Sequence, residues 1–570
     1  MDHRSSTPLG TARRNARRRL RPDVTVTDPP SGVVFDHDVP VVVRDGTVLR
    51  ANVFRPEAPG RYPVLLSAQP YGKDSLPRRR RRGAGHRVPL QYRLAANDAP
   101  MAFSAWTALE APDPGFWVAR GYVVVNVDLR GWGTSGGTPE PFSPTEGADV
   151  HDAVEWAAAQ DWANGRVGMS GVSYLAISQW SAAATRPPHL AAINPWEGFT
   201  DAYADFAYPG GVRESGFMVV WSAWQKLLRP SSPSFRGGQK RHELRDEWWQ
   251  RKAPALEDVE VPALVCGSFS DHSLHSRGSF EGFRRIASPH KWLYTHRGPK
   301  WSTYYDPAVQ QVQARFFDHF LRGEDNGQLE EPAVRVEVRE SRRDVVAVRS
   351  ADTWPPTQAR PVVLHLDAVD NELSPDRPQD AGRTPVPRSG LRLRFRFPEP
   401  ADVVGPMRLR VPVSTTRGDL TLFAAVRKFS AGREVVFEGS YGFTEDLVTR
   451  GWLRASHRPV DLSRSTLWEA HHPHTHREPV EPGTVLDLDL ALLPSATRFA
   501  AGDELELHLR DRWFFPANQL TGQFPAIYQH TPRQAWSVHT GGDLTATLTI
   551  PVWTDDERPL SQHGPADPDH

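Results

Sequence analysis

A serine flanked by small residues is the first candidate for chemistry in this 570-residue sequence. The stretch GVSYLA, residues 171–176, lies where an apolar run turns into YLAISQWSAAAT, so a buried strand should turn sharply into a helix there. Small neighbours permit a strained turn of the G-x-S-x-G type, which lifts a serine hydroxyl above a sheet; Leu175 stands at the position of the last glycine, and the small Ala176 follows it. We therefore predict that Ser173 is a nucleophile, whereas Ser170 lies within the strand and points into packed structure. A glycine-containing turn can also hold a serine without function.

A serine hydroxyl is a weak nucleophile, so it needs a base, an acid that orients the base, and donors for the developing oxyanion. The backbone N–H of Tyr174, next to the serine, is one such donor. Asp271 follows the apolar run VPALVCGSFS, at the carboxyl end of an expected strand, where ligand chemistry gathers in open parallel sheets. Asp271 is therefore the candidate acid, with capping of the following helix as its alternative role.

The candidate base ends the next apolar run. His296 closes KWLYTH as the aspartate closes the run before it, and the order Ser173, Asp271, His296 is that of a known serine triad. Other histidines near these strand ends are alternatives for the base: His272, His275 and His290.

The elements that must position these residues alternate strands with helices. Short, nearly continuous apolar runs predict strands buried on both faces, at residues 62–70, 121–131, 165–173, 261–271 and 291–298. Helical stretches such as GADVHDAVEWAAAQ separate them, which predicts a mostly parallel sheet with crossover helices. We expect this α/β domain to span residues 34–330, with a hairpin at Asp45-Gly46 near its start.

Four stretches carry a resemblance to a known family: RANVFRP (50–56), QPYGKD (69–74), VNVDLRGWGTSGG (125–137) and GVSYLA. They are similar to the α/β-hydrolases of the cocaine esterase and X-prolyl dipeptidyl aminopeptidase group, which includes α-amino-acid ester hydrolases and cephalosporin acylases. The resemblance implies that the hydroxyl of Tyr71 is the second oxyanion donor. The family's histidine usually stands in a G-P-W-x-H sequence, whereas this chain has Lys300, Trp301 and Ser302 in that place.

The resemblance also implies two further parts of the fold. Residues 197–258 are aromatic-rich and helical, where the family inserts a helical cap over its active site. The aromatic residues either form the core of this cap or line an acyl or aryl pocket, for which the candidates are Trp196, Phe206, Trp221 and Trp224. From 331 to 556, alternating runs such as AVRVEVRE and DELELHLRD predict a β-sandwich, which the resemblance specifies as a jelly roll; GWLRASHRP (451–459) is similar to part of it.

Composition narrows the classes of partner. Lys+Arg and Asp+Glu both number 68, so the chain has no overall charge with which to attract nucleic acid or an anionic membrane. No window reaches the roughly 20 apolar residues that a spanning helix requires. The single cysteine, Cys266, forms no internal disulfide, so cytoplasm is the default location. The arginine-rich residues 1–33 and residues 557–570 are expected to be disordered tails, with a targeting or anion-binding role as the alternative for the first.

No cofactor or metal is expected. The histidine-rich HHPHTH (471–476) contains Pro473, and neither cysteine nor carboxylate falls at the usual ligand spacings, so a surface loop is the simpler interpretation. We predict a serine hydrolase that cleaves a small-molecule ester or amide, with an acyl or aminoacyl substrate, through an acyl-enzyme. Monomer and homo-oligomer both stay open. The missing histidine motivates the alternative, an altered hydrolase fold that acts as an acyltransferase or as a non-catalytic ligand-binding protein.

Overall fold

The computed structural model describes residues 23–29, 31–80, 85–94, 99–229, 232–440, 445–515 and 525–555. Most of the two expected tails lies outside these residues. Residues 24–27, which the sequence placed in the first tail, instead form strand β1 (Val24–Thr27), paired in parallel with β7 (Met101–Ser104). The pairing has a physical cause: the alternating VTVT sequence packs Val24 and Val26 against a buried apolar cluster.

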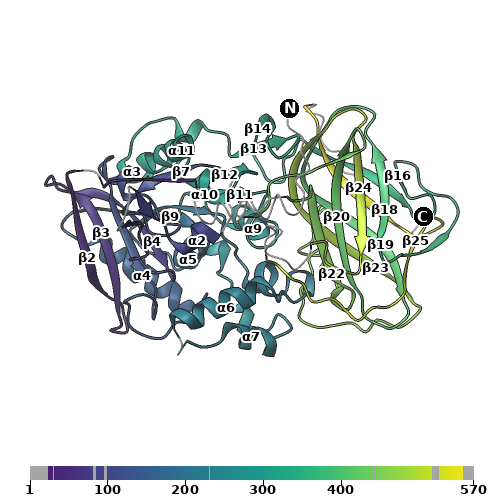
Figure 1. The fold of residues 1–570 in the computed structure, drawn as a ribbon, viewed down its shortest axis with the longest axis horizontal. Helices are drawn as coiled ribbons and strands as arrows, with labels where there is room; N and C mark the ends of the chain where they lie inside the picture. Colours follow the sequence, from purple (N-terminus) through teal and green to yellow (C-terminus); the bar gives the residue numbers. More distant parts are fainter. Residues whose placement is uncertain are drawn as a thin grey trace.

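A mixed, mostly parallel sheet forms the α/β domain, as predicted. Its strands lie in the order β2-β3-β8-β4-β9-β10-β11-β12-β13, and every pair from β8 to β13 is parallel. Their bounds are β2 (Val33–Val42), β3 (Val48–Pro56), β8 (Val123–Asp128), β4 (Tyr62–Gln69), β9 (Ala163–Val172), β10 (Leu190–Trp196), β11 (Ala263–Ser268), β12 (Lys291–His296) and β13 (Val334–Arg339). Helices cover the sheet, including α4 (Pro144–Ala158), α5 (Tyr174–Ala183), α9 (Ser276–Arg285) and α11 (Pro307–Phe317) (Figure 1).

Short helical segments between β10 and β11 form the cap. They are η1 (Ala202–Ala207), η2 (Pro209–Gly211), α6 (Phe217–Leu228), α7 (Phe235–Arg241), α8 (Glu247–Gln250) and η3 (Leu256–Asp258). In Figure 1, α6 and α7 lie at the lower edge of the view. The buried Glu214 carboxylate accepts hydrogen bonds from four backbone N–H groups, three at the start of α6 and one at Ile527 of the second domain. The cap is therefore fastened to the C-terminal half of the chain.

The C-terminal half is a β-sandwich, as predicted. Its longest strands, β19 (Ala401–Thr415) and β23 (Val485–Phe499), pair in antiparallel fashion. The other main strands are β15 (Ala359–Asp367), β18 (Leu391–Arg396), β20 (Thr421–Ser430), β22 (Thr449–Arg454), β24 (Glu504–Arg510), β25 (Trp536–Thr540) and β26 (Thr547–Trp553). Alternate residues of these strands fill one apolar core, which explains the period-2 pattern of the sequence. Among the described helices, none is both long and apolar enough to cross a bilayer.

A buried arginine joins the two halves beside the carboxyl end of β12. The guanidinium of Arg297, which is fully buried, donates to the carbonyl groups of Leu447 and Val448 and lies over the ring of Phe437. Because buried donors need partners, these contacts fix the sandwich against the strand ends of the α/β domain.

Candidate active site

Ser173 occupies a strained turn between β9 and α5. Its backbone has φ 60° and ψ −116°, a region that non-glycine residues rarely adopt and that is found at functional turns. A Cβ atom on Gly171 would lie 2.5 Å from Leu175 Cβ, so the turn requires glycine there. Ala176, three residues after the serine, faces Gly198, where an added Cβ would lie 2.5 Å from the alanine methyl. Two small residues thus allow α5 to approach the segment that follows β10.

The neighbouring serine has a structural setting. Ser170 is fully buried within β9, and its hydroxyl contacts the side chains of Asn194 and Tyr304. It lies in packed structure, as the sequence suggested.

The imidazole in contact with Ser173 belongs to His275. Its Nε2 atom lies 2.9 Å from Ser173 Oγ. His275 is the N-cap residue of α9, in the turn that follows β11, and the carbonyl of Asp271 accepts the N–H groups of Leu274, His275 and Ser276. This turn places the histidine next to the nucleophile. His275 is one of the alternatives that the sequence offered for the base.

The second ring nitrogen of His275 is engaged by the backbone. The Phe199 N–H donates to Nδ1 at 3.2 Å, and the two rings stack with centroids 5.6 Å apart. Since Nδ1 accepts, the neutral ring carries its proton on Nε2 and donates to Ser173 Oγ. Burial, with the nearby Lys300 ammonium, holds the pKa of His275 well below its usual value, so the ring is neutral at pH 7.

Asp271 binds a lysine and not the histidine. Its Oδ2 atom lies 2.5 Å from the Nζ atom of Lys300, and both side chains are fully buried. Burial raises the pKa of Asp271, and the ammonium of Lys300 opposes this rise. Lys300 begins α10 (Lys300–Tyr304), in the segment where the family pattern has its histidine. In that segment a buried cation, paired with Asp271, thus takes the place of an imidazole.

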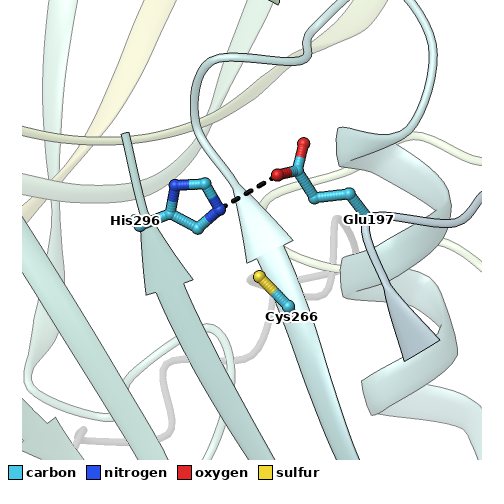
Figure 2. A group of neighbouring side chains, drawn as sticks. All are labelled: Glu197, Cys266 and His296. Atoms are coloured by element: carbon cyan, nitrogen blue, oxygen red, sulfur yellow. Dashed lines mark hydrogen bonds and ion pairs between the residues drawn. The ribbon is translucent and has the colours of Figure 1, made fainter. Parts of the chain in front are cut away.

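His296 is bound to Glu197, so the expected contact between His296 and Ser173 is not present. His296 Nε2 lies 3.0 Å from Glu197 Oε1, and its Nδ1 accepts the Gly298 N–H at 3.1 Å. Figure 2 shows the imidazole directed at the Glu197 carboxylate. The reason is strand order: β12 lies three strands from β9 in the sheet, and Glu197, which follows β10, meets the ring first.

Three potential metal donors meet at these strand ends. Glu197, Cys266 and His296 are buried, and their donor atoms lie within 4.8 Å of one another (Figure 2). Zn²⁺ accepts such a set. Here, however, His296 donates to Glu197 Oε1, the other carboxylate oxygen lies 3.8 Å from the Lys300 ammonium, and burial with the Glu197 charge raises the pKa of the Cys266 thiol well above its usual value. The group therefore fits an internal hydrogen-bonded pair beside a protonated thiol. Its members are far apart in sequence, so only the pairing of strands could reveal it.

The two residues predicted to supply oxyanion donors, Tyr71 and Tyr174, have neighbouring rings. Tyr174 is the first residue of α5, so its N–H has no acceptor within the helix. Tyr71 follows β4, and its ring meets the Tyr174 ring edge-on with centroids 6.4 Å apart. Lys73 fixes this loop, because its buried ammonium pairs with Asp38 at 2.8 Å. The part of the Tyr71 hydroxyl in oxyanion binding stays a prediction.

Three of the four predicted pocket aromatics gather around Tyr174. Phe206 meets Trp221 edge-on at 5.6 Å, Trp221 stacks on Tyr174 at 6.5 Å, and Trp224 lies 5.3 Å from Tyr71. Trp196 packs elsewhere, against Tyr294 and Tyr304. Trp196 belongs to β10, where its side chain enters a different apolar cluster from the cap residues, so the structure does not bring it into the group.

Comparisons with known proteins agree with this architecture. The family model of the X-Pro dipeptidyl-peptidase (S15 family) matches residues 45–299, and that of the X-Pro dipeptidyl-peptidase C-terminal non-catalytic domain matches residues 326–511. Cocaine esterase from Rhodococcus sp. is 34% identical over 187 residues, which are 33% of this chain and 28% of that protein. A putative serine esterase from Mycobacterium tuberculosis is 24% identical over 590 aligned residues, covering 82% of this chain and 88% of that protein.

Solved structures extend the similarity over both domains. A CocE/NonD family hydrolase from Staphylococcus aureus is 33% identical with a TM-score of 0.86, covering 93% of this chain and 99% of that one. An α-amino acid ester hydrolase shares the fold, at 17% identity and a TM-score of 0.65 over 91% of this chain and 97% of that one.

Proposed function

Because the chain belongs to the CocE/NonD family of hydrolases, we propose that it cleaves a small carboxylic ester or amide through an acyl-enzyme formed on Ser173. The observation that carries the proposal is the 2.9 Å contact between Ser173 Oγ and His275 Nε2 on a strained turn. A nucleophile and an imidazole within hydrogen-bond reach are the minimal pair for covalent acyl transfer.

His275 is the proposed general base. To accept the serine proton at Nε2, the neutral ring must carry its own proton on Nδ1, where the Phe199 N–H now donates. Activation of Ser173 therefore includes release of Nδ1 by the segment that carries Phe199. Glu197, with φ 50°, and Gly198 precede Phe199 in this segment, whose displacement would free Nδ1.

Asp271 and Lys300 are proposed as positioning residues. Asp271, which binds the Lys300 ammonium through its carboxylate, also caps the turn that carries His275 through its backbone carbonyl. The Lys300 charge favours the neutral imidazole before reaction. Tyr174, through its N–H, and Tyr71, through its hydroxyl, are the proposed oxyanion donors.

The substrate is proposed to carry an apolar acyl or aryl group. The aromatic rings beside Tyr174 come from the cap and from the loop that holds Phe142, whose ring stacks on Tyr174 at 4.9 Å. Ligand sites are usually lined by such aromatic surfaces with a few placed polar groups. The members of the family act on both ester and peptide bonds by name, and the leaving group stays open for this chain.

Covalent labelling with a fluorophosphonate probe tests the proposal. The wild-type chain should be labelled at Ser173, and Ser173→Ala should lose both label and hydrolysis of p-nitrophenyl butyrate. Ser170→Ala is the matched control: it should keep the label and instead lower the unfolding temperature, because it removes buried hydrogen bonds. Label that persists in Ser173→Ala would reject Ser173 as nucleophile. Absence of label from the wild type would favour the non-catalytic binding protein, for which the proton position on His275 is the supporting observation.

A further inference from the structure

A cavity of about 310 Å³ lies between the cap, helix α9 and the β-sandwich. Its walls come from segments far apart in sequence, including Thr200 to Asp205 of the cap, Leu274 to Arg285 of α9 and its preceding turn, and Arg464 to His474 of the sandwich. Ser173, Tyr71 and Tyr174 do not line it. The cavity is therefore separate from the candidate active site, and its volume is in the range of small-molecule sites.

One wall of the cavity is formed by the two segments that contact His275. Leu274 lines the cavity and directly precedes His275 in the chain, and Thr200 lines it and directly follows Phe199, the donor to His275 Nδ1. A molecule in the cavity would thus touch both segments that set the position and the tautomer of the imidazole.

One of the arginines that line the cavity has no ion-pair partner among the described residues. Arg245 pairs with Asp201, Arg277 with Asp205, and Arg284 with Glu281 and Glu469. Arg285 pairs with Glu257, outside the cavity. Arg464 alone among the lining arginines forms no ion pair with any residue that the structure describes. Apart from the Arg285–Glu257 pair, four arginines balance four carboxylates of the wall, and the exposed Arg464 is the one whose guanidinium has no carboxylate within 4 Å among the described residues.

A buried histidine also presents a donor to this space. The Arg477 guanidinium donates to Nε2 of His457, so His457 carries its proton on Nδ1 and donates it to Nδ1 of His474, 3.2 Å away. His474 must then carry its proton on Nε2, for which the described residues provide no acceptor. His474 is 7% exposed, and its backbone φ of 56° is strained. Burial and its charged neighbours hold the pKa of His474 well below its usual value, so the ring is a neutral donor.

Apolar side chains form another part of the wall, beside its polar groups. Leu274, Phe280, Trp354 and Trp452 line it, and the rings of Phe280 and Trp354 stack with centroids 4.6 Å apart. Apolar rings beside one cation without an ion-pair partner and one buried N–H donor favour a particular kind of molecule, an organic anion with an apolar part.

We propose that this cavity binds a small organic carboxylate, with Arg464 supplying the charge and the Nε2–H of His474 a hydrogen bond, while the apolar part of the molecule packs against Phe280 and Trp354. The acid released by hydrolysis of an ester and a free cellular acid share this chemistry. The site does not depend on the proposed hydrolase activity.

Calorimetric titration of the full chain carrying Ser173→Ala tests the site without turnover. With 4-phenylbutyrate as the probe, we expect one site, with binding at least about tenfold tighter than that of the uncharged 4-phenylbutanol. Arg464→Gln should weaken phenylbutyrate binding about tenfold, because it removes the unpaired charge. The matched control is Arg388→Gln, an exposed arginine of the same domain that does not line the cavity, and it should leave binding unchanged.

Two further measurements secure the assignment. His474→Leu should weaken phenylbutyrate binding several-fold, whereas His474→Gln, which keeps an N–H donor, should bind close to the parent affinity. Wild-type chain labelled at Ser173 by a fluorophosphonate should still bind the probe. The proposal is overturned by equal affinity for acid and alcohol, by unchanged binding in Arg464→Gln, by loss of binding on labelling of Ser173, or by no binding at millimolar probe. Because binding is measured in a chain without the nucleophile, its failure would leave the hydrolase proposal untouched.

Discussion

The Nε2 atom of His275 lies 2.9 Å from the Oγ atom of Ser173, although His275 stands four residues after Asp271, in the turn where only the acid of a triad was expected. One strand end, that of β11, therefore provides both the histidine and the carboxylate. The end of β12 provides His296 and Lys300, and both are bound to carboxylates. The expected acid and base lie at the ends of two different strands. In the structure the histidine and Asp271 both follow β11, and Asp271 pairs with Lys300 and not with the histidine.

Substitution of the two histidines should separate their roles. We expect His275→Ala to lower kcat for p-nitrophenyl butyrate by about 10²- to 10⁴-fold, the range for loss of a general base. His296→Gln retains an N–H donor toward Glu197, so kcat should change by less than about tenfold, with the main effect on unfolding temperature. Steady-state kinetics of both purified variants provides the measurement. The reverse ranking would return the role of base to His296.

The pH dependence of kcat/KM should reflect the environment of His275. Burial and the Lys300 charge lower the pKa of this imidazole, so its neutral form, which catalysis needs, persists below pH 6.5. Activity should therefore be nearly constant between pH 6.5 and 8 and should fall only in more acidic solution. Measurement of kcat/KM against pH, in buffers of constant ionic strength, gives the midpoint of this fall in activity. A midpoint at or above 6.5 would contradict the assignment, since an unperturbed histidine titrates there.

The sequence predicted what depends on local pattern. The turn at Ser173, the parallel strands and the β-sandwich follow from glycine spacing and from the period of apolar residues, which are properties of single segments. Local pattern does not predict which residue each titratable group contacts. Whether His296 meets Ser173 or Glu197 depends on which strand lies between them, and strand order is a long-range property.

One particular signal could have improved the prediction of the site. Lys300 stands in the segment of the absent family histidine, and a buried lysine there requires a carboxylate, which the ends of β11 and β10 supply as Asp271 and Glu197. If Asp271 pairs with Lys300, it is not available to orient a histidine at the end of β12. His275, one turn beyond Asp271, is then the nearest candidate for the base of Ser173. The tail boundary failed for another reason: the four residues of β1 form a strand only because β7 offers an edge.

Loss of the Tyr71 hydroxyl should reduce kcat and leave KM nearly unchanged. One oxyanion donor is worth about 10²- to 10³-fold in rate, and it acts mainly in the transition state, so Tyr71→Phe should lower kcat by that factor. Tyr62→Phe is a suitable control, because the Tyr62 hydroxyl bonds only the Ala58 carbonyl at the surface. Steady-state kinetics with an activated ester distinguishes the two. An unchanged kcat in Tyr71→Phe would remove the hydroxyl from the oxyanion site.

The buried carboxyl group of Glu146, which contacts Tyr174, should make the free energy of unfolding depend on pH. Glu146 accepts the Tyr174 hydroxyl at 2.9 Å, and burial raises the pKa of Glu146 to about 8, against 4.5 for the ordinary side chain. The folded chain therefore holds a proton that the unfolded chain releases above pH 4.5. The stability due to this group is fully present below pH 4.5 and is lost as pH rises through 8.

Glu146→Gln isolates this contribution, because glutamine resembles the protonated carboxyl group and does not titrate. Each pH unit in the window costs the wild type about 1.4 kcal/mol relative to the variant, so the variant should gain about 2 to 3 kcal/mol between pH 6 and 8. Urea unfolding of both chains at the two pH values measures the change. Glu140→Gln, at an exposed position just before α4, should show no such change. A pH-independent difference between wild type and Glu146→Gln would mean that Glu146 is ionised in the folded protein at pH 6.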